Sequence, residues 1–276
     1  MSTTIKLACL ACCLVGPLVH ADERHPAFES KYTVSLGGLL ANRIFNASAG
    51  GSVTIDRPGP FVDFESDLKL DDSPELFVLE FQWQFSENWN LGLQHFNATR
   101  SGSNTLGKTI EWEDVIYEIG AEVNATTEID ITRIVFSRKL WQNNGHDFRV
   151  SVGLHWLDVA ARISGEATLG DGSTVFTRSQ ASASLPIPNV GGVYRYSPSE
   201  KWLFGVRADW LSASVGDYSG GIWNAVAYVN YRVSDHFGVG LGYQLFQIDG
   251  TLSASRWRGD IKTRINGPIL QVAGFW

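Results

Sequence analysis

Histidine is the side chain that most often acts as a general base or metal ligand near neutral pH, so the histidines are the first candidates for chemistry in this chain. One of them, His155, lies on the polar face of an expected strand. His95 falls on the apolar face of another. The others that follow the apolar N-terminal segment precede the first strand or lie in short turns: His25, His146 and His236. His155 is therefore the candidate for proton-transfer chemistry.

His155 lacks an evident nucleophile to activate. Ser151 shares its face, but four strand residues span about 13 Å, too far for a hydrogen bond. A partner could come from a neighbouring strand, such as Ser137 or Asn189, although nothing local requires one. We therefore predict no catalytic residue and interpret His155 as a packed polar side chain, with an enzymatic role kept as an alternative.

Charged residues recur on the same polar faces as His155. Because their signs are mixed, they can neutralise one another if the strands bring these faces together. With the histidine, this set of polar residues is Glu80, Arg133, Arg149, His155, Arg207, Asp209 and Arg232.

The elements that position these residues show a period of two. Between Glu75 and Phe85, large apolar residues alternate with mainly polar ones, which is typical of a strand and not of a helix. The same alternation recurs along the chain. Short polar breaks at 86–88, 142–147, 197–200 and 234–236 separate the strands on one side. Longer connections separate them on the other, and the longest are 46–73, 102–124 and 166–184.

Short turns on one side and long loops on the other are typical of bacterial outer-membrane barrels. We predict an all-β fold, a transmembrane antiparallel up-and-down β-barrel of ten strands over residues 22–276, with eight or twelve strands as alternatives. A soluble β-fold is the other possibility. The 10 Trp, 15 Phe and 8 Tyr favour a membrane barrel with aromatic girdles.

The N-terminus resembles a secretory leader. Lys6 precedes an apolar run at 7–19, and Ala21 follows as a small residue at the expected cleavage site. We predict a signal peptide over 1–21. It contains every cysteine of the chain, so the mature protein is expected to have no disulfide or thiolate site. The formal net charge of −7 argues against nucleic acid as a partner.

The C-terminus resembles the assembly signal of outer-membrane proteins, in which alternate apolar residues end on an aromatic one. The matching residues are Leu270, Val272, Gly274 and Trp276, with Trp276 in place of the usual Phe. Other segments, such as 62–72, 216–220 and 235–243, are similar to those of proteobacterial outer-membrane barrel proteins of unassigned function. This resemblance implies a Gram-negative outer-membrane location and recognition by the barrel assembly machinery, and it implies no catalytic residue.

The expected outer loops are acidic. Their residues are Asp63, Glu65, Asp67, Asp71, Asp72, Glu111, Glu113 and Asp114. Oxygen ligands suit Ca²⁺ or Mg²⁺, so these loops could bind such an ion, alone or bridging lipopolysaccharide phosphates, although the spacing matches no EF-hand. No other cofactor is expected. Omptin-type proteases use paired aspartates with a His–Asp couple at the outer rim, but here no histidine lies near the acidic pairs in sequence.

The sequence thus predicts a monomeric barrel in outer-membrane lipid and lipopolysaccharide, with a narrow, polar, plugged lumen. Its role is either structural, with the charged residues filling the lumen, or porin-like, with a basic-leaning path for a small solute. The alternatives are an outer-membrane enzyme, either a protease or a lipid A-modifying hydrolase, and an adhesin or lipopolysaccharide-binding surface protein.

Overall fold

A computed structural model describes residues 24–40, 43–50, 62–63, 67–70, 75–112, 115–168, 173–215, 218–254 and 257–276. The expected leader lies outside these residues. Among the described residues, no helix is long and apolar enough to cross a membrane. One short 3₁₀-helix, η1 (Pro26–Phe28), precedes the first strand.

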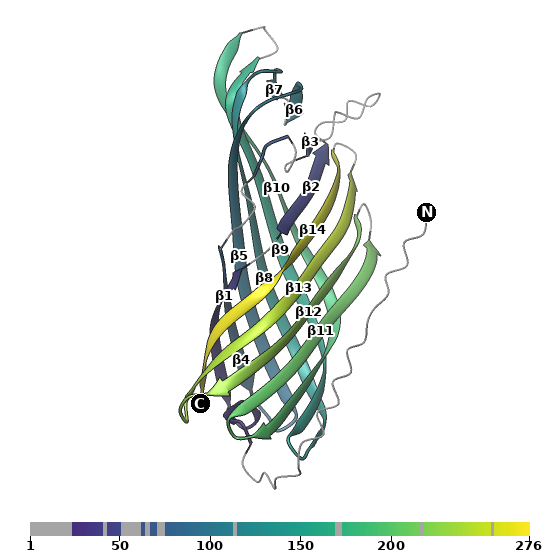
Figure 1. The fold of residues 1–276 in the computed structure, drawn as a ribbon. Coiled ribbons are helices and arrows are strands. Elements are labelled where there is room, and N and C mark those ends of the chain that lie inside the picture. The colour runs from purple at the N-terminus through teal and green to yellow at the C-terminus, as the bar shows by residue number, and fades with distance from the viewer. Residues whose placement is uncertain are drawn as a thin grey trace, which may run out of the picture.

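The rest of the described chain is dominated by strands that form a single closed sheet (Figure 1). Their bounds are β1 (Tyr32–Leu40), β2 (Arg43–Gly50), β3 (Val62–Asp63), β4 (Glu75–Gln84), β5 (Trp89–Thr105), β6 (Ile110–Trp112), β7 (Val115–Tyr117), β8 (Glu122–Asn143), β9 (His146–Thr168), β10 (Thr174–Ser199), β11 (Trp202–Val215), β12 (Tyr218–Arg232), β13 (Phe237–Ala254) and β14 (Trp257–Phe275).

The sheet closes because β1 pairs with both β4 and β14. Leu39 of β1 faces Ile269 of β14, and Arg43 of β2 faces Asn266 of the same strand. Strands β1 and β2 are therefore consecutive parts of one barrel strand. With β4, β5 and β8 to β14, this confirms the expected antiparallel barrel of ten strands.

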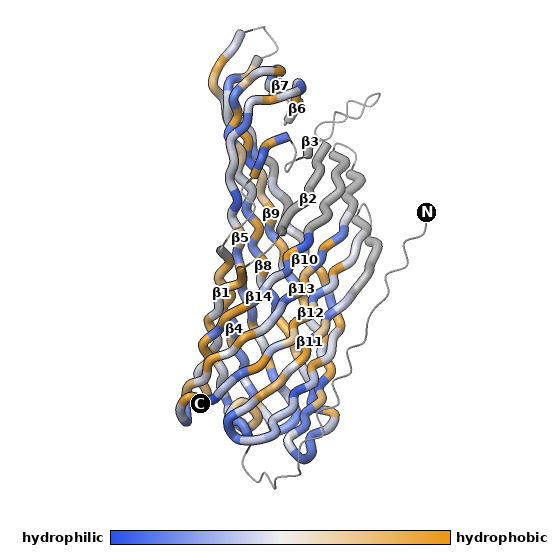
Figure 2. The backbone as a smooth tube through the Cα atoms, viewed as in Figure 1, coloured by the Kyte–Doolittle hydropathy of each residue, from blue (hydrophilic) through white to orange (hydrophobic). Residues whose placement is uncertain are grey.

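The outward face of the barrel carries a band of large apolar side chains. The turns at one end of the barrel are hydrophilic (Figure 2). Two sets of tryptophans border the band, Trp83, Trp89 and Trp202 near the short turns and Trp156, Trp210 and Trp223 farther along the strands; all six are exposed. The stretch from Trp202 to Trp210 rises about 20 Å along the barrel axis at ordinary strand rise and tilt. This band matches the hydrocarbon layer of a bilayer, so the protein is a transmembrane barrel of the bacterial outer membrane.

The short turns lie at the same end as the C-terminus, which is the periplasmic end in such barrels (Figure 1). On the opposite, outer side the wall is uneven. Strands β8, β9 and β10 have 22, 23 and 26 residues, and together with β5 they extend beyond β11 to β14.

The long strands β9 and β10 correct one expectation. The long loop predicted over 166–184 is wrong, because β9 continues to Thr168 and β10 begins at Thr174. The predicted loop over 102–124 is likewise shortened by β5, which reaches Thr105, and by β8, which starts at Glu122. These stretches are rich in polar residues and glycine, and this composition made them resemble loops.

Strands β10 and β11 separate above the lipid band. Their ladder runs outward as far as Val190 and Trp210, whereas the ladder between β10 and β9 continues to Thr174. Pro186 and Pro188 lie just beyond the point of separation. Proline has no N–H to donate, so the hydrogen bonds lost are those toward β11.

The terminal strand has the alternation that was expected. Leu270, Val272 and Trp276 are exposed on the lipid-facing side. A Cβ on Gly274 would lie 2.3 Å from the Trp276 ring, so glycine lets the final indole fold back over the strand. Recognition of this segment by the assembly machinery stays a prediction.

Candidate functional site

The barrel lumen is the candidate site, and its polar centre contains most of the predicted charged residues. Arg133 on β8 donates through its NH2 group to Asp209 Oδ1 on β11 at 2.8 Å. Arg207 NH1 lies 3.4 Å from Glu80 Oε1 on β4, across the lumen from β11. Arg207 Nη2 donates to Gln94 Oε1 at 3.3 Å, and Arg207 Nε lies 3.8 Å from Asp209 Oδ2. We call Glu80, Gln94, Arg133, Arg207 and Asp209 the central layer.

Because side chains alternate between the two faces of a strand, these groups all point into the lumen. A close approach between β10 and β11 determines the place of Asp209. A Cβ on Gly191 of β10 would lie 2.2 Å from Asp209 Oδ1. Glycine therefore makes room for the carboxylate between β10 and β11. Asp209 is fully buried, which fixes the guanidinium groups around it.

His155 is buried beside the central layer and bonds to an amide. Its Nδ1–H donates to Asn189 Oδ1 at 3.2 Å, and its ring lies 6.2 Å from that of Phe246. Asn189 was one of the two partners considered from the sequence. This contact joins the imidazole to neither a nucleophile nor a carboxylate. His95, expected on the lipid face, is exposed and contacts Thr132 Oγ1 at 3.0 Å.

A second charged cluster lies nearer the periplasm and includes two residues that sequence reasoning missed, Asp147 and Arg195. Asp147 Oδ1 accepts from Arg149 Nε at 2.9 Å and from Arg195 Nε at 3.1 Å. Both missed residues lie near strand ends and have the inward parity of Ser151 or Val193. Extending the period of two to the first and last residues of each strand would have found them.

One predicted lumen residue lies elsewhere. Arg232 is at the end of β12, where it donates to Glu200 Oε2 at 2.7 Å and also pairs with Asp235. Both partners lie in the polar turns at the periplasmic rim. Arg232 is the last residue of β12 and shares the inward parity of Asn230, but it lies at the periplasmic rim and makes no ion pair with the central layer among the described residues.

The segment that contains η1 closes the periplasmic mouth, and we call residues 24–31 the N-terminal plug. Arg195 NH1 donates to the Ala27 carbonyl at 2.9 Å, and its guanidinium lies 4.7 Å from the centre of the buried Phe28 ring. The His25 backbone N–H donates to Ser197 Oγ at 3.0 Å. The His25 ring packs edge-on against Phe275 at 5.1 Å. Strands β10 and β14 thus hold the plug in place.

His25 makes the attachment of the plug dependent on pH. Burial lowers the pKa of His25 from its usual 6.5 to about 4. Between these values the unfolded chain binds a proton that the folded plug excludes. Stability is therefore complete above pH 6.5 and falls as the pH drops toward 4.

We expect the wild-type barrel to lose about 2–3 kcal/mol of unfolding free energy from this group between pH 7.5 and 4.5. Urea unfolding in lipid vesicles at both pH values measures the loss. The variant His25→Gln should show a correspondingly smaller decrease, since glutamine does not titrate. Equal decreases for the two proteins would contradict the prediction.

Between the plug and the central layer lies a polar chamber of about 110 Å³. Its wall includes four arginines, Arg133, Arg149, Arg195 and Arg207. Several buried polar atoms have no hydrogen-bond partner among the described residues, including Arg133 Nε, Arg207 Nε and Ser151 Oγ. The chamber has room for several water molecules or for one small polar solute.

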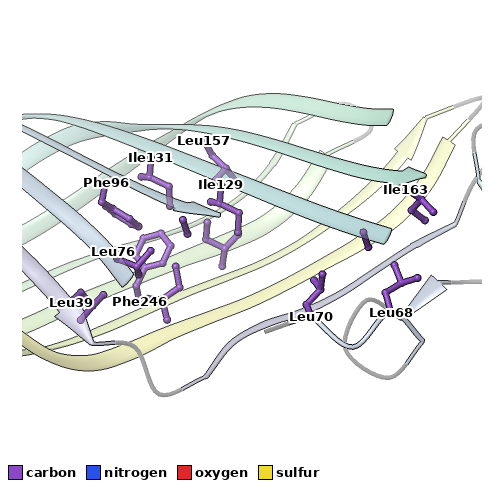
Figure 3. Close-up of a cluster of buried hydrophobic side chains, with 14 of the residues drawn as sticks. Leu39, Leu68, Leu70, Leu76, Phe96, Ile129, Ile131, Leu157, Ile163 and Phe246 are labelled. Carbon is purple, nitrogen blue, oxygen red and sulfur yellow. The ribbon is translucent and has the colours of Figure 1, made fainter. Parts of the chain in front are cut away.

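Above the chamber a cluster of apolar side chains fills the lumen, and the sequence alone did not predict it. Phe96 and Phe246 meet edge-to-face at 5.5 Å, and Leu39, Leu76 and Ile131 gather around them (Figure 3). We call these five residues the apolar belt. All five are at most 2% exposed, so they pack closely above the polar chamber.

Further apolar residues continue the closure outward. Leu68 and Leu70 lie farther along the lumen in Figure 3, and both are buried. Arg100 NH2 donates to the Leu70 carbonyl at 3.1 Å, which holds this segment against β5. Of the expected acidic loop residues, Asp67 pairs with Lys108 at 2.7 Å.

The described residues contain no group of three or more His, Cys, Asp or Glu side chains able to hold a metal ion. The acidic residues at 65, 71, 72, 113 and 114 lie outside the described residues, so the proposed Ca²⁺ or Mg²⁺ site stays a prediction.

No protein-family model and no curated protein sequence matches the chain. Solved outer-membrane barrels match it in structure. The outer-membrane protease OmpT from Escherichia coli has a TM-score of 0.57 at 7% identity, over 89% of this chain and 96% of that one. The toluene transporter TodX from Pseudomonas putida has a TM-score of 0.39 at 12% identity, over 88% and 89%. The attachment invasion locus protein Ail of Yersinia pestis has a TM-score of 0.31 at 11% identity, over 90% and 98%. At these identities, the similarity to OmpT supports the barrel fold alone.

Proposed function

We propose that this barrel is a gated passage for small polar solutes that prefers anions, and that the described conformation is its closed state. The observation that carries the proposal is the chamber of about 110 Å³ lined by four arginines. Three buried or half-buried carboxylates accompany them, those of Glu80, Asp147 and Asp209. The wall therefore has an excess of positive charge, which favours an anion.

The unpartnered donors also favour a solute site over a purely structural filling. A buried donor without a partner costs about 1–3 kcal/mol. A lumen that served only to fill the barrel would be expected to pair every such group. Arg133 Nε and Arg207 Nε instead have no hydrogen-bond partner among the described residues, although Arg207 Nε lies 3.8 Å from Asp209 Oδ2. The guanidinium groups in the chamber wall could bind carboxylate or phosphate oxygens of a small solute or, between solutes, water.

Passage requires the plug to move. The plug is attached by few contacts, namely the Arg195 bond to Ala27, the Phe28 ring and the His25 contacts. The apolar belt above the chamber is more extensive and excludes water from the outer route. We therefore place the more readily opened gate at the periplasmic mouth, with widening of the belt as the second step of passage.

Single-channel recording in planar bilayers tests this function. We expect the wild type to open rarely and Phe28→Ala to open at least about tenfold more often, since burial of this ring is worth roughly 1.5–3 kcal/mol to the closed state. In a KCl gradient the reversal potential should indicate anion preference, and Arg207→Gln should reduce it. Phe237→Ala, which truncates a lipid-facing ring, is the matched control and should behave like the wild type.

Absence of single-channel steps from every variant would contradict passage and leave the structural role. Steps with cation preference would contradict the proposed solute class alone. His155 gives no support to an enzymatic alternative, because the described structure pairs its ring with an amide.

A further inference from the structure

A groove on the outside of the barrel has the form of a lipid site. It has a volume of about 620 Å³ and crosses the wall from β5 to β12. Its lining is almost wholly apolar and lies on the lipid-facing side, where Val152 is 60% exposed. The residues that define it are Trp89, Phe136, Val152, Val190, Trp210 and Trp223.

The strand register explains the shape of the groove. Phe136 faces Val152, Val152 faces Val190, Val190 faces Trp210, and Trp210 faces Trp223. Small side chains therefore occupy the middle of one continuous row, and large aromatic rings stand at its ends. Four inter-strand spacings separate Phe136 on β8 from Trp223 on β12, so the row is about 19 Å long. These dimensions suit an extended acyl chain.

The two ends of the groove differ in charge. At the periplasmic end, Arg138 faces Trp89 in the β5–β8 ladder, and its guanidinium lies 5.6 Å from the centre of the Trp89 ring. Arg138 makes no ion pair within the described part of the chain. At the outer end, the lining consists of Trp210 and Trp223 and includes no basic residue among those described.

We propose that this groove binds one phospholipid of the periplasmic leaflet, with an acyl chain along the valine floor and its phosphate at Arg138. The charge distribution determines the choice of lipid. A lipopolysaccharide would present its phosphates at the outer surface, where the groove has no cation. A phospholipid of the periplasmic leaflet presents its phosphate at the level of Arg138, where tryptophan and arginine are favoured at the membrane interface.

Native mass spectrometry of the refolded, delipidated barrel with added dipalmitoyl phosphatidylglycerol tests the site. We expect the wild type to retain one lipid under conditions that remove the others. Val152→Trp should fill the groove and abolish retention. Arg138→Gln should weaken it about tenfold, the loss expected for one charge-assisted hydrogen bond.

Two matched controls separate a specific site from general lipid contact. Val239→Trp places the same ring on the lipid-facing side of β13, away from the groove. Lys31→Gln removes another interfacial cation, whose Nζ lies 5.5 Å from the Tyr32 ring. Both controls should retain the lipid as the wild type does.

Equal losses for Val152→Trp and Val239→Trp would overturn the proposal, as would failure of the wild type to retain any lipid. Unchanged retention by Arg138→Gln would overturn the assignment of the phosphate. Circular dichroism and the heat-dependent gel shift show whether each variant folds. If Val152→Trp does not fold, Ala208→Phe replaces it, because Ala208 on β11 lines the same groove.

Discussion

Replacing Asp209 with alanine is expected to lower the free energy of unfolding by about 3–5 kcal/mol, the usual cost of removing one partner from a buried charge pair. The Asp209 side chain is fully buried, 2.8 Å from Arg133 and 3.8 Å from Arg207. Without it, two buried guanidinium groups would share Glu80 as the remaining carboxylate of the central layer. Their mutual repulsion and lost hydration explain the size of the effect.

Urea unfolding in lipid vesicles measures the loss, and two further variants interpret it. Asp158→Ala removes an exposed carboxylate from the outer face of β9 and should change stability by less than about 0.5 kcal/mol. Arg133→Met combined with Asp209→Ala should restore part of the lost stability, because the uncompensated charge is removed with its partner. Simple additivity of the two substitutions would show that the pair is not coupled.

Replacing Phe246 with alanine is the second change with a large expected effect, about 3–5 kcal/mol of destabilisation from the cavity left in the apolar belt. Phe246 is 1% exposed and packs against Phe96 and the His155 ring. The substitution should also admit water through the belt, because the rings that seal the chamber from above no longer meet.

Unfolding in vesicles gives the stability of Phe246→Ala, and planar-bilayer recording shows whether its outer seal leaks. Phe237→Ala serves again as the control, since its ring faces lipid and is 52% exposed. A loss of stability no greater than that of Phe237→Ala would show that the belt is not tightly packed. If Phe246→Ala conducts no more than the wild type, the residues above the apolar belt close the lumen by themselves.

The alternation of apolar and polar residues was sufficient to predict the barrel and its ten strands. Because side chains point to opposite faces in turn, parity alone placed Arg133, Arg149, His155, Arg207 and Asp209 on the inward face. Parity also turns Arg232 inward, but this last residue of β12 lies close enough to the turns to pair with Glu200 and Asp235 and not with the central layer.

Height along the lumen could not be predicted in the same way. Phe96, Ile131 and Phe246 share the inward parity of the charged residues, but the sequence does not say at which level each strand brings its apolar residues together. That depends on register between neighbouring strands, such as the facing of His155 and Arg133. Contacts across the lumen are harder still, since Glu80 and Arg207 are 127 residues apart in sequence.

The split between β10 and β11 also bears on how the barrel behaves beside its neighbours. Outside the bilayer, the stretch of β10 from Thr174 to Asn189 has no pairing toward β11 among the residues that the structure describes, so it is a free strand edge within that part of the chain. Such edges readily join the edges of other molecules and start aggregation. Pro186 and Pro188 deny a foreign strand the donors it needs at this edge. Pro186 and Pro188, which lie where β10 separates from β11, thereby also disfavour edge-to-edge association between neighbouring barrels.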